Sequence, residues 1–106
     1  MNKEPITKSK STSKKNHYWT FLSNHSHVIV CLHRDPEIRL KDISALVGIT
    51  ERAVQAIIND LLTADVLKIE KIGRRNKYIL NLDYPLRHQL ENKRKIGELL
   101  RLIGKD

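Results

Sequence analysis

The sequence is poor in cysteine, in aromatic residues and in long apolar runs, and each shortage excludes a class of protein. It has one cysteine, Cys31, so it cannot form an internal disulfide, which favours a reducing compartment. No stretch approaches the roughly 20 apolar residues that cross a bilayer. The Lys- and Ser-rich start lacks the apolar segment of a secretory signal. We therefore predict a cytoplasmic protein without membrane contact.

Positive charge is in excess: the 106 residues carry a formal net charge of +8. Residues 1–16 hold five Lys and one Glu, which gives +4, and residues 17–106 hold 15 basic and 11 acidic side chains, which gives another +4. Such an excess favours polyanionic partners through counterion release. Residues 1–16 show no apolar periodicity and are predicted to be a disordered basic tail, which either lies on DNA or only aids solubility.

Three helices are predicted before the apolar periodicity changes near residue 64. The first covers residues 24–33 after the candidate N-cap Ser23, although its β-branched run also suits a strand. The other two cover residues 41–47 and 51–63, separated by a turn that begins at Gly48. Their predicted inward-facing residues are Val28, Ile29, Leu32, Ile43, Leu46, Val47, Val54, Ile57, Ile58, Leu61 and Leu62.

The remaining elements are two strand signals and a last helix. Two alternating runs flank Gly73-Arg74-Arg75-Asn76 and predict a β-hairpin over 67–82. Ile38 and Leu40 are expected in a short strand, and a C-terminal helix is expected from near Asp83 within 83–106. The predicted fold is mainly α with a small hairpin: helix, short strand, helix, helix, two-stranded hairpin, C-terminal helix.

The segment from Leu40 to Leu61 has the layout of a helix-turn-helix. Small Ser44 and the turn at Gly48 let the two helices cross steeply, and the second helix packs through residues that include Val54. Its opposite side is then free to enter a major groove, where Arg binds guanine and Gln or Asn binds adenine.

On these residues the sequence resembles the winged helix-turn-helix superfamily, in the group of small single-domain MarR-like and ArsR-like prokaryotic transcriptional regulators. The resemblance lies in Trp19 to Leu22, Gly48 to Gln55 and Gly73 to Asn76, and covers roughly residues 18–103. It implies that residues 17–82 form a DNA-binding domain with a recognition helix at 51–63 and a wing at 67–82. Ser44 departs from the Ala that the pattern favours, but it is small enough for the crossing.

The predicted partner is double-stranded DNA, read in the major groove by the second helix and held at the minor groove or backbone by the wing. Arg74, Arg75 and Lys77 have no carboxylate within two residues in the sequence. The predicted DNA-binding residues are Lys41, Thr50, Arg52, Ala53, Gln55, Ala56, Asn59, Arg74, Arg75, Asn76 and Lys77.

The C-terminal helix is predicted to form a homodimer, because its apolar stripe exceeds what one domain covers. The alternative is that this helix packs on the first helix of its own chain. The predicted dimerisation residues are Leu90, Ile96, Leu99, Leu100 and Ile103.

No cofactor, metal or catalytic residue is predicted. His88 and Glu91 form a His-x-x-Glu pattern whose partners are not at metal-binding spacing, and no nucleophilic or paired-carboxylate arrangement indicates an enzyme. Cys31 is expected to be a buried thiol rather than a redox sensor. Trp19 and Phe21 are expected in the core or a dimer contact, with an effector pocket for an unknown small molecule as the alternative. The alternative functions are a winged-helix protein-interaction module and, more weakly, a binder of structured RNA.

Overall fold

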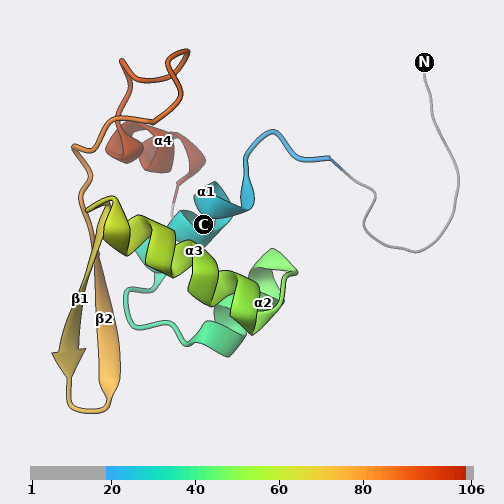
Figure 1. The fold of residues 1–106 in the computed structure, drawn as a ribbon, viewed down its shortest axis with the longest axis vertical. Coiled ribbons are helices and arrows are strands. Elements are labelled where there is room, and N and C mark those ends of the chain that lie inside the picture. Colours follow the sequence, from blue (N-terminus) through green and yellow to red (C-terminus); the bar gives the residue numbers. More distant parts are fainter. Residues whose placement is uncertain (1–18, 105–106) are drawn as a thin grey trace, which may run out of the picture.

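The computed structural model describes residues 19–104, so the predicted basic tail lies outside the described part. Four helices and a two-stranded antiparallel hairpin make up this small α/β domain (Figure 1). The elements are α1 (Asn24–Arg34), α2 (Leu40–Val47), α3 (Glu51–Thr63), β1 (Leu67–Ile72), β2 (Arg75–Leu80) and α4 (Ile96–Ile103). In Figure 1, α3 crosses in front of α1, and the hairpin extends beyond the helices.

The first three helices are confirmed to within one residue. Ser23 caps α1 by accepting a hydrogen bond from the backbone N–H of Ser26 at 3.3 Å. The β-branched run at 28–30 is helical because Val28 and Ile29 pack into the core together with Leu32. Burial of this face therefore decides between the two structures that the sequence allowed.

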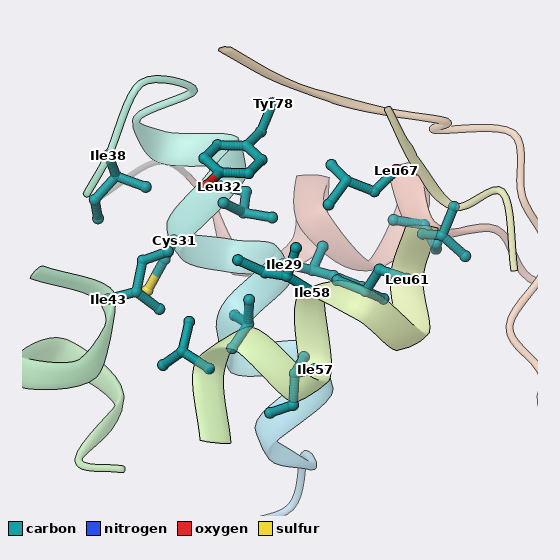
Figure 2. Close-up of a cluster of buried hydrophobic side chains, with 14 of the residues drawn as sticks. Ile29, Cys31, Leu32, Ile38, Ile43, Ile57, Ile58, Leu61, Leu67 and Tyr78 are labelled. Carbon is teal, nitrogen blue, oxygen red and sulfur yellow. The ribbon is translucent and has the colours of Figure 1, made fainter. Parts of the chain in front are cut away.

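The core is entirely apolar and lies between α1, α2, α3, the base of the hairpin and α4 (Figure 2). The largest fully buried side chains are Leu32, Ile43, Ile58, Val28 and Val54. Leu46 was predicted to face inward, and this is wrong, because its side chain is 71% exposed. The two-turn α2 buries Ile43 alone, with Val47 half-buried beside it.

The connection from α3 to the hairpin is set by a left-handed residue. Asp65 has φ +63°, and the N–H of Val66 donates to the carbonyl of Leu61 at 3.0 Å. Asp65 N–H donates in turn to Leu62, which completes a Schellman ending. Val66 and Leu61 are both buried, so this turn fixes the direction in which the chain enters β1.

The hairpin is confirmed, with a tighter turn than predicted. Leu67 pairs with Leu80 and Ile72 with Arg75, so only Gly73 and Arg74 form the turn, and Arg75 and Asn76 belong to β2. Gly73 has φ +61°, as the first residue of a two-residue hairpin turn requires.

The short strand predicted at Ile38 and Leu40 is wrong. Leu40 begins α2, and the segment before it makes a single backbone hydrogen bond to β2, from Tyr78 N–H to the carbonyl of Pro36 at 2.7 Å. Pro36 has no N–H to donate, so it cannot add the next bond of a strand ladder.

The C-terminal helix is much shorter than predicted. Residues 81–95 form turns and bends, and the backbone at Tyr84 and Leu86 pairs with Ile96 and Arg94, which closes a loop over the residues between. Helix α4 begins only at Ile96. There the Glu98 carboxylate accepts a hydrogen bond from the backbone N–H of Lys95 at 2.8 Å.

Helix α4 packs on its own chain, mainly through Ile96 and Leu100, which are buried in the core. Its second residue, Gly97, lies against Leu82: the Gly97 N–H donates to the Leu82 carbonyl at 2.9 Å. A Cβ at Gly97 would stand 3.0 Å from that oxygen, so a larger residue would push the Leu82 backbone away from α4. Within the described residues, no helix is long and apolar enough to span a bilayer.

Candidate nucleic-acid interface

The turn between α2 and α3 is held by its own backbone and by one hydroxyl. Gly48 ends α2 with φ +84°, and its N–H donates to the carbonyl of Ser44 at 2.9 Å. The Ser44 hydroxyl in turn donates to the carbonyl of Ile49. Ser44 therefore ties the end of α2 to the start of the next helix, a bond that an alanine would not make.

Thr50 begins α3 as predicted, because its hydroxyl accepts a hydrogen bond from the Ala53 N–H at 3.0 Å. The Thr50 hydroxyl is therefore already engaged in a hydrogen bond within the protein. Glu51 in the first turn is favourable at the positive end of the helix dipole. The cap and the turn together fix the direction of α3.

Helix α3 has one buried and one exposed side. Val54, Ile57, Ile58 and Leu61 are buried, whereas four of the predicted base-contacting residues are exposed and Ala53 is half-buried. The exposed residues are Arg52, Gln55, Ala56 and Asn59. Gln55 Nε2 donates to Asn59 Oδ1 at 3.1 Å, which aligns the two amides along the helix. Arg52 has no hydrogen bond or ion pair with another described residue.

The arginines of the hairpin differ in their surroundings. Arg75 Nη2 donates to the backbone carbonyl of Glu37 at 2.9 Å, and its Nε lies 3.8 Å from Glu37 Oε1. Arg75 thus has a carboxylate beside it from a distant part of the chain, although none lies within two residues in the sequence. Lys77 lies opposite Glu70 in the strand register. Arg74, at the turn, is exposed and makes no polar contact with another described residue.

Asn76 is half-buried, and its Oδ1 is buried without a hydrogen-bond partner among the described residues. Such an atom carries a desolvation cost that a donor would remove.

A groove of about 580 Å³ brings the start of α2 next to the hairpin turn. Lys41 lines it from α2, and Arg74, Arg75 and Asn76 line it from the hairpin. Arg39 lies there too, and sequence reasoning did not select it, although it is a basic residue directly before the helix. Four basic side chains thus face Glu37 and Glu51, which leaves the groove with a positive excess.

The structure does not bring all predicted site residues together. Gln55 and Asn59 lie further along α3 and do not line this groove. Of the predicted dimerisation residues, Ile96 and Leu100 are buried in the chain's own core, and Leu90 lies in the loop before α4, 86% exposed. Leu99 and Ile103 are half-buried on α4. The five residues therefore do not form one exposed helical stripe.

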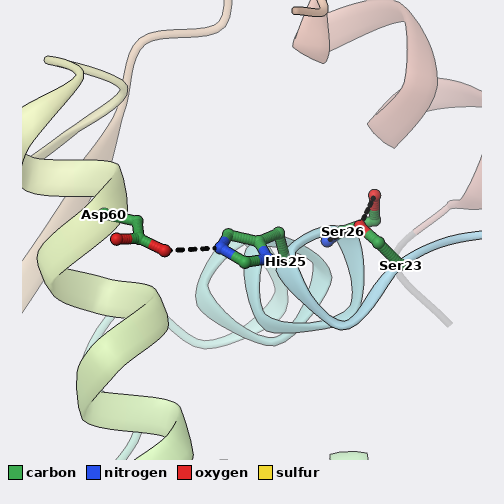
Figure 3. A network of polar contacts seen from close by, with 4 residues as sticks. All are labelled: Ser23, His25, Ser26 and Asp60. Atoms are coloured by element: carbon green, nitrogen blue, oxygen red, sulfur yellow. Dashed lines mark hydrogen bonds and ion pairs between the residues drawn. The ribbon is translucent and has the colours of Figure 1, made fainter. Parts of the chain in front are cut away.

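A polar contact missed in the sequence connects α1 to α3. His25 Nε2 lies 2.8 Å from Asp60 Oδ2, on the residue after Asn59 (Figure 3). The two residues are 35 positions apart, so no local pattern indicates the pair. The Asp60 carboxylate, which follows the exposed amide of Asn59 on α3, is therefore already paired within the protein.

Cys31 is buried, and this burial raises the pKa of its thiol, although nearby Arg34 acts in the opposite direction. Within residues 19–104, no three His, Cys, Asp or Glu side chains lie close enough together to bind a metal ion. A scan of protein-family models and a search of curated proteins find no match to the chain.

Proposed function

We propose that this chain is a winged helix-turn-helix protein that binds double-stranded DNA as a homodimer and regulates transcription in the cytoplasm. Helix α3 would enter the major groove, and the hairpin would act as the wing on the flanking backbone or minor groove. The order of elements supports this assignment, because two helices joined by a short turn, α2 and α3, are followed directly by an antiparallel hairpin.

The observation that carries the proposal is the exposed side of α3. It presents one arginine and two amides around the small Ala56, which is the only exposed apolar residue between positions 52 and 59. Arg pairs bidentately with guanine, and Gln or Asn pairs with adenine. A side chain as small as alanine lets the helix backbone approach the base edges. This side therefore has the chemistry of direct readout.

The groove between α2 and the hairpin supplies the second argument. Lys41 and Arg74 face it from two elements, and neither forms an ion pair with another described residue. Two free cations beside a reading helix suit phosphates on either side of a major groove. Arg39 joins this group as an expected phosphate contact.

The test is selection of bound duplexes from a random pool, followed by affinity measurements on the selected site. We expect a defined site, and we expect Arg52→Ala to cost about 1–3 kcal/mol and to relax specificity at one base pair. Lys93→Ala is the matched control, since it removes one exposed cation from the loop before α4. Selection without enrichment, or equal losses for the two variants, would contradict the assignment. Competition with an RNA duplex separates the two nucleic acids.

A protein-interaction module is the second candidate, and one observation favours it. Trp19 and Phe21 are 77% and 92% exposed, which is unusual for two large apolar side chains. In that case the chain would bind a partner protein and would show no affinity for random duplexes even at low salt.

A further inference from the structure

The aromatic residues ahead of α1 do not pack into the fold. Figure 1 shows the segment before α1 extending away from the helices. Trp19 and Phe21 contact each other edge to face, with ring centroids 4.9 Å apart, and neither belongs to the core or to the apolar residues packed against it. They are the only Trp and the only Phe of the chain. Two such side chains in water indicate an absent partner surface.

A second apolar feature lies next to this segment. A groove of about 740 Å³ runs between α1 and α2 and reaches the end of α4. Its apolar lining consists of Leu22, Val30, Cys31, Ile38, Leu46, Val47 and Ile103, and its polar lining of His27, Arg34, Asp35 and Asp42. Leu22, the residue directly after Phe21, already lines this groove, whereas the two aromatic rings do not. The described residues therefore include both an exposed apolar pair and an apolar groove that none of them fills.

We propose that this groove receives Trp19 and Phe21 of a second copy of the chain, and that the exchange is mutual. An exposed group and its receptor on the same molecule give a self-complementary surface, which closes as a two-fold dimer. At the far end of α1 from the aromatic pair, Arg34 lines the groove and offers a cation to an incoming ring. This inference gives the proposed homodimer an interface other than the predicted C-terminal stripe, and it does not depend on DNA binding.

The buried area reaches the lower end of what a stable dimer needs. Trp and Phe side chains each bury roughly 150–250 Å², so two mutual insertions of the pair remove about 600–1,000 Å² of ring surface from water. The smaller groove surfaces beneath the rings bring the total to about 900–1,300 Å², the lower end of the range of standard specific interfaces.

The chain's own tail is a poor occupant for this groove. Residues 1–16 contain only Met1 and Ile6 as apolar side chains, among five Lys. Such a segment cannot fill an apolar groove of this size. In addition, none of the predicted DNA-binding residues lines the groove, so a dimer formed here leaves α3 and the hairpin free.

The test is sedimentation velocity of the full chain without DNA. We expect twice the monomer mass at about 0.1 mM, a fall toward the monomer mass on dilution, and monomers for Phe21→Ser and Leu46→Lys. Both replaced side chains are exposed, at 92% and 71%, so circular dichroism should show an unchanged fold. Leu90→Lys is the matched control: it puts the same charge on another exposed leucine, 86% exposed and outside the groove, and should stay dimeric.

Trp19 provides an independent readout, because a single tryptophan reports its own environment. Its emission should shift to longer wavelength on dilution and in Leu46→Lys, as the ring leaves the partner's groove. A monomer throughout the concentration range would overturn the proposal, and so would a dimer that survives Phe21→Ser and Leu46→Lys. A buried Trp19 whose emission does not change with concentration would also overturn it, since the ring would then lie in its own chain. Because no DNA is present, these outcomes are separate from failure of the proposed DNA binding.

Discussion

Two neighbouring arginines of the hairpin are expected to respond differently to the same substitution. Arg75 donates to the Glu37 carbonyl at 2.9 Å and joins the hairpin to the segment before α2, whereas Arg74 has no polar partner among the described residues. Arg75→Ala should therefore reduce stability. A hydrogen bond from a charged donor contributes about 1.5–3 kcal/mol when shielded. The Arg75 and Glu37 side chains are 49% and 46% exposed, so we expect only about 1 kcal/mol.

That loss should lower the Tm by about 4–8 °C in a domain of this size. Arg74→Ala should change the free energy of unfolding by less than about 0.5 kcal/mol, because it removes no contact within the described fold. Its effect should fall on DNA binding instead. Loss of one phosphate contact reduces the slope of log K against log salt by about 0.9.

Thermal unfolding and salt-dependent fluorescence anisotropy with a labelled duplex measure both quantities for each variant. Lys93→Ala is the control for charge, since residue 93 lies in the loop before α4, at the opposite end of the molecule from the hairpin turn (Figure 1). Equal Tm losses for Arg74→Ala and Arg75→Ala would refute the reasoning. An unchanged salt slope for Arg74→Ala would remove this residue from the interface.

Substitutions at Gly97 and at Ser44 and chemical labelling of Cys31 test three further details of the fold. Gly97→Ala should destabilise the protein by about 1–3 kcal/mol in urea unfolding, because the new Cβ would meet the Leu82 carbonyl oxygen at 3.0 Å; no loss would mean that α4 does not pack so closely. Ser44→Ala should cost about 0.5–1.5 kcal/mol through the lost bond to Ile49, with Ser44→Thr as a check on whether a hydroxyl restores it. The raised pKa of the Cys31 thiol, which is buried but lines the groove between α1 and α2, keeps it protonated at neutral pH, so a disulfide reagent should react with it much more slowly than with a free thiol, and rapid labelling of the native protein would contradict its burial.

The parts of the fold that the sequence predicted well are those set by local chemistry. Helix α3 has a cap at Thr50, a continuous apolar stripe and 13 residues, so its bounds follow from neighbouring residues alone. The turn at Gly48 and the hairpin at Gly73 need a positive φ, which glycine marks in the sequence.

The errors come from contacts between distant residues. The predicted C-terminal helix is interrupted because the backbone at Tyr84 and Leu86 pairs with Ile96 and Arg94, an arrangement that helical spacing cannot reveal. Leu46 has the spacing of a core residue, but it lies on the rim of the groove between α1 and α2.

At the candidate interface, too, features set by neighbouring residues were predictable, and contacts between distant residues were not. The residue types on α3 follow from its amphipathic pattern, whereas the contact of Arg75 with Glu37, 38 residues away, does not. Likewise, only the folded chain places Lys41 and Arg39 beside the hairpin turn. The sequence therefore predicts which side chains α3 exposes better than it predicts which arginines lack a polar partner among the described residues.

The central claim is that α3 and the hairpin turn bind duplex DNA, and it is tested most directly by two double variants of equal charge. Affinity for the selected duplex is measured for Arg52→Ala with Arg74→Ala, and for Lys93→Ala with Arg101→Ala, in the full chain at one salt concentration. We expect the first pair to lose roughly 10- to 100-fold or more and the second pair less than about threefold. Equal losses in the two pairs, or no binding by the parent chain at low salt, would contradict the account.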